Sequence, residues 1–472
     1  MSIHIVNKKL YFGMGDSMSK KRYEIDMCNG PLAGKILMFT FPLMLSNIMQ
    51  LLFNAVDMIV AGRYCGSNAL AAVGATSSLI NLLINFFVGL SIGANVLVAR
   101  YYGEHNKKDL REMVNTSIAT SIIGGFVLTI IGVVLARPLL IMMHTPEEVL
   151  GQAILYLRIY FLGMPALSLY NFGSAILRAA GDTKRPLYFL TIAGVINAVL
   201  NIIFVVYCGL GVSGVALGTI FSQVVSSALV IICLVKSEGI VRLKIKEIKI
   251  HKAKFKKMMQ IGAPAGIQGT VFSLSNVLIQ SSINSFGSVA MAGSSASSNI
   301  ENFVYMSMNS FHHTALNFTG QNVGAKKYDR VNKILIMCVG LVALVGIIIG
   351  GGVCLGAEGL LRFYTNDPEV IKYGVIRLTI ICSTYFLCGI MDTVVGVLRG
   401  LGYAAVPMVV SIIGACGLRI VWIMTIFANF RTLKVLYLSY PVTWIITTVA
   451  HIICFFIIRK KILSFVDSEN YQ

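Results

Sequence analysis

Long runs of apolar residues, separated by short polar segments, make up most of the chain. Each run has the length of about 20 residues that a helix needs to cross the hydrocarbon core of a bilayer. The runs cover approximately residues 36–62, 69–99, 114–136, 153–177, 187–207, 212–235, 258–286, 289–320, 334–356, 370–398, 408–428 and 437–458. The pattern predicts an all-α membrane protein with twelve transmembrane helices. Because Pro42, Pro165 and Pro264 lie inside three of the runs, we expect bends there.

The two halves of this pattern repeat. A shift of 221 residues places Gly66 on Gly287 and Leu177-Arg178 on Leu398-Arg399, and a shift of 222 places Pro42 on Pro264. Such a repeat predicts two pseudo-symmetric six-helix bundles that enter the membrane in the same direction, a geometry typical of transporters. The predicted organisation is an N-terminal segment (1–33), an N-lobe with helices 1–6 (34–235), a basic linker (236–257), a C-lobe with helices 7–12 (258–458) and a tail (459–472).

Composition and charge exclude several classes of protein. With 56% hydrophobic and 12% charged residues, the chain is far too apolar for a soluble enzyme. Of its 39 Lys and Arg residues, 30 fall in the segments on the side of the N-terminus, which predicts a multi-pass protein of the cell (inner) membrane with both termini cytoplasmic. These basic residues lie between apolar runs, so their expected partner is the lipid bilayer and not nucleic acid. The linker, with nine of them, is either a solvated tether beside anionic headgroups or a specific regulatory site.

Polar side chains inside the apolar runs are candidate functional groups. Asp57 lies in the first run, where a carboxylate is costly unless it is paired, protonated or facing a cavity. Asn197 and Asn201 are four residues apart, so they share one helix face, and Thr219 lies in the next run. Together these four residues can hold Na⁺ or orient a carboxyl group that carries H⁺. The alternative is a packing or capping role for Asp57, near Arg63 at the end of its helix.

Several short stretches resemble the multidrug and toxic compound extrusion (MATE) family, in the bacterial branch with an acidic residue in transmembrane helix 1. The resemblance covers about residues 31–461. The stretches are Val56-Asp57 with Gly62-Arg63, Leu177 to Asp182, Asn197 to Asn201, Ile300-Glu301, Gly320 to Ala325, and Leu398 to Gly402.

The resemblance implies roles for individual residues. Asp57, Asn197, Asn201 and Thr219 match the positions of a cation site in the N-lobe, although the family often has a carboxylate where this chain has Asn201. Asn171 either belongs to that network or makes a hydrogen bond between helices.

Glu301 matches a C-lobe residue that faces a central cleft, where it would attract cationic drugs. Met306 and His312, on the same helix, are further candidates for contact with substrate. A structural ion pair is the alternative role for Glu301, with Arg419 as the expected partner and Asp392 as a competitor for it.

Together with these patterns, the resemblance implies a secondary active multidrug efflux transporter that exports small organic cations in exchange for H⁺ or Na⁺ by alternating access. The alternative is a flippase for lipid-linked saccharide precursors, whose anionic cargo would favour basic groups in the cleft, such as Arg158, Arg377 and Arg419. An enzyme is not expected, because the sequence has no clustered catalytic residues and no phosphate-binding loop. The ten cysteines are scattered, so we expect no resident metal or other cofactor. The expected oligomeric state is a monomer.

Overall fold

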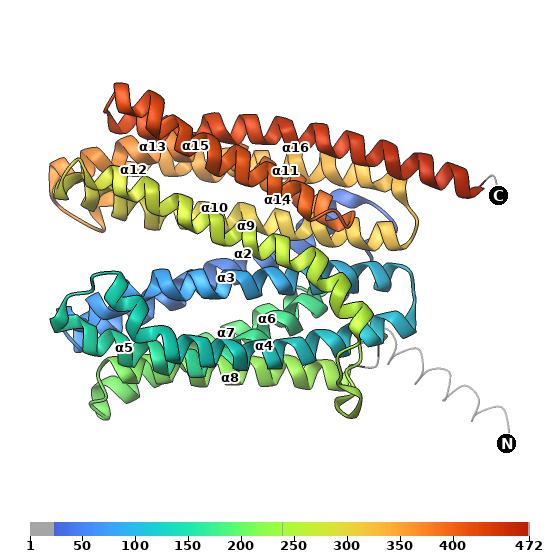
Figure 1. Ribbon diagram of the computed structural model, residues 1–472, viewed down its shortest axis with the longest axis horizontal. Helices are drawn as coiled ribbons and strands as arrows, with labels where there is room; N and C mark the ends of the chain where they lie inside the picture. The colour runs from blue at the N-terminus through green and yellow to red at the C-terminus, as the bar shows by residue number, and fades with distance from the viewer. Residues whose placement is uncertain (1–22, 238, 471–472) are drawn as a thin grey trace, which may run out of the picture.

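The computed structural model describes residues 23–237 and 239–470, and every regular element within them is helical (Figure 1). Of the predicted N-terminal segment, residues 1–22 lie outside the described residues, as do residues 471–472 of the tail. The N-terminal half contains α2 (Leu32–Tyr64), α3 (Ser67–Gly103), α4 (Lys107–Met142), α5 (Glu147–Leu162), α6 (Met164–Ala179), α7 (Lys184–Ile202), the π-helical turn η1 (Ile203–Tyr207) and α8 (Val212–Lys236). The C-terminal half contains α9 (Lys252–Asn284), α10 (Ser288–Gly324), α11 (Tyr328–Leu355), α12 (Ala357–Arg362), α13 (Pro368–Gly400), α14 (Ala405–Ser411), η3 (Ile412–Gly417), α15 (Leu418–Trp422), η4 (Ile423–Phe427) and α16 (Leu433–Asn470).

These elements supply the twelve predicted spans. In the described part of the chain, nine helices are long and apolar enough to cross a membrane, and the bent pair α5 and α6 adds a tenth span. The other two spans are α9 and α10, with 33 and 37 residues. They are as long as the others but more polar, because both run along the interface between the two halves of the molecule.

The prolines have unequal effects on their helices. The fourth span bends by 47° between α5 and α6, where Gly163 precedes Met164 and Pro165. Pro165 has no N–H to continue the helical hydrogen bonds, which explains the break. Pro42 and Pro264, by contrast, lie within the continuous helices α2 and α9, so neither proline ends its helix.

The backbone repeats with the shift seen in the sequence. Helices α3 and α10 are each 37 residues long and begin and end 221 positions apart. Each follows a glycine in the same left-handed conformation, with φ of 88° at Gly66 and 91° at Gly287. A side chain is strained at such a φ, which accounts for glycine at both positions. Gly181 and Gly402, also 221 residues apart, form a second such pair, with φ of 97° and 95°.

The two bundles meet on the side of the molecule that carries the α8–α9 linker, which we call the linker side. There, the backbones of α3 and α9 are in close contact at Gly89 and Gly93 on α3 and at Gly262 and Gly266 on α9. A Cβ atom on Gly89 would lie 2.2 Å from the backbone nitrogen of Gly266. Two G-x-x-x-G sequences therefore let the helices approach more closely than side chains would allow.

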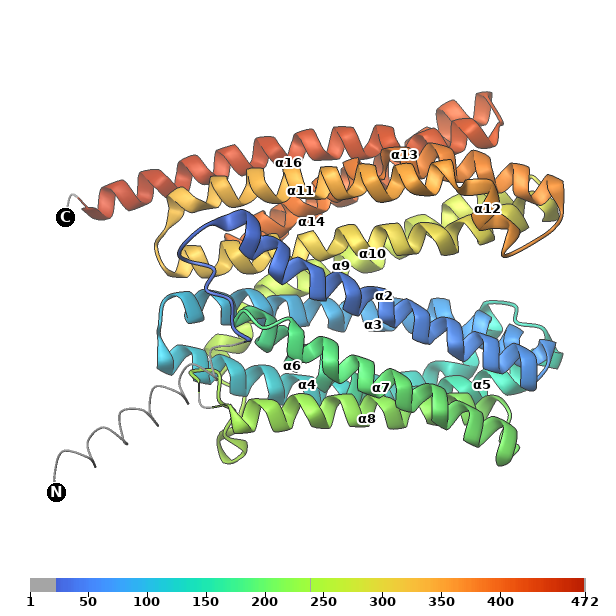
Figure 2. The same ribbon diagram turned by 180° about the vertical axis from the view of Figure 1, so that it is seen from behind.

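Helix α2 belongs to both bundles. Its linker-side half packs in the C-lobe core through Ile36, Phe39 and Leu43, and the Thr40 and Thr314 hydroxyls are 2.8 Å apart. Its other half packs against α7. Figure 2 shows α2 crossing from one bundle to the other. Any change in how α2 packs on α7 can therefore act on the C-lobe.

Candidate functional site

Asp57 is buried on α2 and accepts hydrogen bonds from two neighbouring helices. Nδ2 of Asn201, on α7, donates to its Oδ1 at 2.5 Å, and the hydroxyl of Thr219, on α8, donates to its Oδ2 at 3.2 Å. Asn197 completes the group, because its Nδ2 donates to Oγ1 of Thr219 at 3.4 Å. The structure thus brings together all four residues that the sequence singles out for cation coupling.

Two glycines make this arrangement possible, and sequence analysis did not identify either. A Cβ atom on Gly218, in α8, would lie 2.1 Å from Oδ1 of Asn201. On α7, a Cβ atom on Gly194 would lie 1.8 Å from the ring of Phe53, which is one turn before Asp57. Small residues at these positions let α2, α7 and α8 approach closely enough for the polar side chains to meet. Gly218 immediately precedes Thr219, and this adjacency was the feature of the sequence that could have identified Gly218 as part of the site.

The main chain of α7 changes just after Asn201. Residues Ile203–Tyr207 form a π-helical turn, a feature that is common at functional sites. The fold repeats it, since Ile423–Phe427 in the equivalent span of the C-lobe is also π-helical. Each turn lies toward the end of its span that is opposite the linker side.

Not all of the hydrogen-bonding capacity of this polar group is used. The Thr219 hydroxyl lies 3.2 Å from Oδ2 of Asp57 and 3.0 Å from the carbonyl oxygen of Val215, so it can donate to either acceptor. Oδ1 of Asn201 is buried without a hydrogen-bond partner among the described residues. Carboxylate, amide and hydroxyl oxygens are the ligand types that hard cations prefer. The arrangement can therefore exchange a proton or, after an amide rotation, contact a small cation.

Asn171 is not part of this hydrogen-bonded group as far as the structure describes it. It lies on α6 and lines a small cavity with residues of α3 and α4, among them Phe87, Val88 and Leu128. Asn171 stays a prediction without a structural link to Asp57.

Glu301 is buried on α10 and makes an ion pair with Arg377 of α13. The guanidinium donates from Nε to Oε1 and from a terminal nitrogen to Oε2, each at 2.8 Å. Arg377 also donates to the hydroxyl of Ser294 at 2.5 Å and lies over the ring of Tyr437. Both carboxylate oxygens of Glu301 are therefore engaged by the same guanidinium.

The prediction that Arg419 would be the partner of Glu301 was wrong. Arg377 is in reach because α13 packs along α10, whereas Arg419 lies on α15, which contacts α16. The Arg419 guanidinium lies 4.1 Å from the centre of the Tyr440 ring, a cation–π contact. Asp392, the suggested competitor for Arg419, lies instead in a polar network with His312.

That network connects three helices of the C-lobe. Nδ1 of His312 is 2.8 Å from the backbone oxygen of Asp392, and its Nε2 is 3.3 Å from a terminal nitrogen of Arg399. Arg399 also donates to Oε1 of Gln268 on α9, at 2.8 Å. His312 is buried and held on both ring nitrogens. Met306, the third residue assigned to a substrate cleft, lies where α10 meets α2, and its backbone oxygen accepts a hydrogen bond from Asn47 of α2 at 3.3 Å.

The comparisons with known proteins agree with this architecture. The family model described as MatE matches the chain twice, over residues 42–203 and 264–425. The chain belongs to the MATE family. Among its curated relatives, the probable multidrug resistance protein YoeA of Bacillus subtilis is 27% identical over 419 residues, which cover 87% of this chain and 90% of that protein. The probable multidrug resistance protein NorM of Thermotoga maritima is 25% identical over 383 residues, 80% of this chain and 82% of the relative.

A solved structure shows the same fold. It is described as the outward-facing conformation of a multidrug resistance MATE family transporter, and it superposes with a TM-score of 0.85 at 21% identity, over 94% of this chain and 98% of the other. As a MATE protein, the chain is a multi-pass membrane transporter and not an enzyme. The resemblance to the MATE family stated from sequence stretches is thereby confirmed, and the branch with an acidic residue in transmembrane helix 1 stays a prediction.

Proposed function

We propose that this MATE protein is a secondary active multidrug exporter, in which proton uptake at Asp57 drives the export of organic cations. It works as a monomer in the cell (inner) membrane, with the linker side and both termini in the cytoplasm. The single observation that carries the proposal is the buried Asp57 carboxylate bound by Asn201 and Thr219. The names of the relatives YoeA and NorM support organic compounds as cargo.

The hydrogen bonds favour H⁺ over Na⁺ as the coupling ion. Both donors point at the Asp57 oxygens, an arrangement that stabilises the charged carboxylate before it takes up a proton. When Asp57 takes up a proton, the Thr219 hydroxyl can donate to the Val215 oxygen at 3.0 Å and accept from the new carboxyl group. Proton binding therefore needs no heavy atom to move. Na⁺ would require the Asn201 amide to turn its oxygen inward, and it would meet one carboxylate where two would compensate its charge better.

Coupling between ion and cargo would use α2. Charge loss at Asp57 weakens its hydrogen bonds to α7 and α8, and α2 transmits the change because its other half is buried in the C-lobe core. The lobes touch on the linker side, where α3 crosses α9 and Gln321 of α10 donates to the backbone oxygen of Ala179 at 2.7 Å. With that side in the cytoplasm, the conformation is outward-facing, ready to release cargo and to bind H⁺.

The flippase alternative lacks support in the positions of its basic residues. Arg377 is neutralised by Glu301, and Arg419 lies over Tyr440. The third candidate, Arg158, is exposed on α5 and donates from Nε to the backbone oxygen of Val133 at 3.3 Å. An anionic saccharide carrier would find none of these three guanidinium groups available between the lobes.

The deciding experiment measures uptake of ethidium, a fluorescent organic cation, by proteoliposomes under separately imposed proton and sodium gradients. We expect the proton gradient alone to drive uphill transport, and Asp57→Asn to abolish it while the protein stays folded. Glu358→Gln, which removes an exposed carboxylate on the surface of the C-lobe, is the matched control and should transport normally. Transport driven by sodium alone, or undiminished in Asp57→Asn, would remove Asp57 protonation from the mechanism.

A further inference from the structure

The linker between α8 and α9 is a folded part of the N-lobe. Val241 and Leu243 are fully buried in the N-lobe core, and the N–H of Leu243 donates to the backbone oxygen of Leu234 at 3.0 Å. A single 3₁₀ turn, Ile245–Glu247, follows. At the end of the linker, the backbone N–H of His251 donates to the hydroxyl of Thr116 on α4 at 3.1 Å. The described part of the linker is therefore held against α8 and α4 and is not a free tether.

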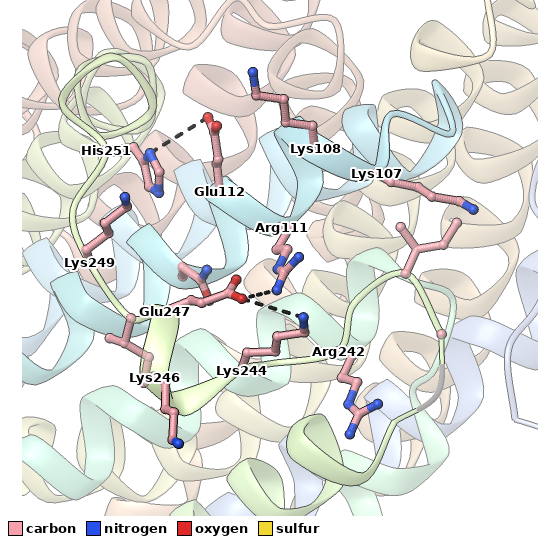
Figure 3. A pocket seen from close by; sticks show the side chains of 14 residues that line it. Lys107, Lys108, Arg111, Glu112, Arg242, Lys244, Lys246, Glu247, Lys249 and His251 are labelled. Atoms are coloured by element: carbon pink, nitrogen blue, oxygen red, sulfur yellow. Dashed lines mark hydrogen bonds and ion pairs between the residues drawn. The ribbon is translucent and has the colours of Figure 1, made fainter.

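Linker and α4 together line an open basic pocket of about 800 Å³ (Figure 3). Its walls are the first turns of α4 and the linker segment 239–251. The Lys and Arg residues that line it are Lys107, Lys108, Arg111, Arg242, Lys244, Lys246 and Lys249. The lining contains two acidic residues, Glu112 and Glu247.

Both acidic residues of the basic pocket lie close to basic side chains that line it. Glu247 makes ion pairs with Arg111 and, at 3.5 Å, with Lys244, as Figure 3 shows. Glu112 lies 3.8 Å from Nδ1 of His251. Among the described residues, five of the basic side chains have no ion pair: Lys107, Lys108, Arg242, Lys246 and Lys249. Cations held around one cavity repel each other, so an anion that enters it relieves this repulsion as well as gaining its own attraction.

We propose that the basic pocket binds an anion with two or more phosphate charges, and that this anion holds the linker against α4. The volume exceeds what a single phosphate fills, and the five unpaired cations come from both walls. A soluble polyphosphate and the headgroup of an acidic phospholipid share this chemistry. The headgroup is within reach because the pocket lies at the end of the α4 span, where clusters of four to eight basic residues are typical of anionic lipid binding.

Occupancy would regulate the transport cycle. The linker leads directly into α9, whose Gly262 and Gly266 form the contact with α3 that closes the linker side. Lys254, in the first turn of α9, is also held to the first turn of α4, with Nζ 2.7 Å from Asp109. An anion that fixes the linker on α4 stabilises this closed arrangement and slows its opening. Binding at the pocket does not depend on which compounds are transported or which ion drives transport.

The test uses the full-length protein and measures its thermal unfolding with sodium tripolyphosphate in detergent and, separately, in phosphatidylcholine nanodiscs with and without cardiolipin, whose headgroup has two phosphates. The pocket variant combines Lys107→Gln, Lys108→Gln, Arg242→Gln and Lys246→Gln. The matched control, Lys252→Gln, Lys256→Gln, Lys257→Gln and Lys460→Gln, removes the same charge from exposed sites outside the pocket. We expect the anion to raise Tm in the wild type and the control, and the pocket variant to bind at least about tenfold more weakly.

The two arms distinguish the sources of the phosphate. A Tm increase with tripolyphosphate identifies a soluble ligand, and one confined to cardiolipin nanodiscs identifies a lipid headgroup. If the fourfold variant does not fold, Lys107→Gln with Lys108→Gln, both on the exposed first turn of α4, replaces it. No Tm increase in either arm, or an equal loss of binding in the control variant, would overturn the proposal, because the response would then reflect overall charge.

Discussion

At the scale of single residues, a glycine decides the geometry of the cation site. Gly218→Ala places a methyl group 2.1 Å from Oδ1 of Asn201 and must displace the amide from Asp57. We expect proton-driven ethidium transport to fall by about tenfold or more, with a stability loss of about 1–3 kcal/mol from overpacking. Gly351→Ala in α11, whose Cβ would meet nothing within 4 Å, is the matched control and should keep both normal transport and normal stability. Normal transport by Gly218→Ala would show that the Asn201–Asp57 contact is dispensable.

The Glu301–Arg377 ion pair gives a second prediction at this scale. Glu301→Gln leaves the buried Arg377 uncompensated, which costs about 3–5 kcal/mol of the free energy of unfolding. Replacing both residues, with Glu301→Gln and Arg377→Met, should restore much of that loss in a double-mutant cycle measured by thermal unfolding in detergent. A structural pair also predicts equal loss of transport for cationic and neutral dyes. Selective loss for cationic dyes, with stability intact, would instead support the cargo-binding role that the family resemblance implies for Glu301.

These residues show what sequence can predict about a site. Asn197 and Asn201 were identifiable because helical spacing alone puts them on one face, and Asp57 because a buried carboxylate is costly. The partner of Glu301 could not be identified from the sequence, because it depends on which helices are neighbours and in what register they pack. Arg377 and Arg419 both lie within apolar runs, and only the packing of α13 along α10 shows which of them reaches Glu301.

At the scale of helices, the α3–α9 crossing should control which side of the transporter is closed. Gly89→Ala puts a Cβ atom 2.2 Å from the Gly266 nitrogen, so the lobes must separate on the linker side. We expect the closed arrangement to lose about 1–3 kcal/mol relative to the open one. Lys108 and Asp329 are both exposed at the linker-side ends of their lobes. Double electron–electron resonance between spin labels on cysteines introduced at these two positions should then report longer distances.

Gly269→Ala on α9, the other helix of this crossing, is the control. Its Cβ would lie 3.6 Å from the Cβ of Asn85, an ordinary contact, so the distances should not change. Equal lengthening in both variants would mean that helix propensity, and not the close backbone contact, sets the conformation.

The helices themselves were predictable because twelve apolar runs of sufficient length leave few alternatives. The interruptions of the helices were less predictable. The helical fourth span is broken at Gly163, whereas the helices that contain Pro42 and Pro264 are continuous. A proline inside a span can be accommodated when neighbouring groups compensate the lost hydrogen bond. The folded linker was also missed. Val241 and Leu243 are two apolar residues among many charges, and their burial depends on the groove that the N-lobe offers them.

The whole molecule has a second connection between its lobes, the segment 23–31. Ile25 donates its N–H to the backbone oxygen of Gly181 in the N-lobe at 3.1 Å. On the C-lobe, Asn322 donates to the backbone oxygen of Met27 at 3.0 Å, and Nζ of Lys327 lies 2.6 Å from Oδ1 of Asn29. The segment therefore crosses the closed linker side and adds to the contacts that must break when this side opens.

The orientation of the whole molecule in the membrane gives the last prediction. Both the proposed direction of transport and the assignment of the closed side depend on the linker side being cytoplasmic, as 30 of the 39 basic residues indicate. The chain supplies its own marker for the opposite side: Cys208 is exposed in the loop between η1 and α8. A membrane-impermeant maleimide added to intact cells should label Cys208 but not Lys246→Cys in a Cys208→Ser background. Lys246→Cys should react only after permeabilisation, because its position lies in the linker. Labelling of Lys246→Cys from outside would invert the topology, and the closed linker side would then be the external gate of an inward-facing transporter.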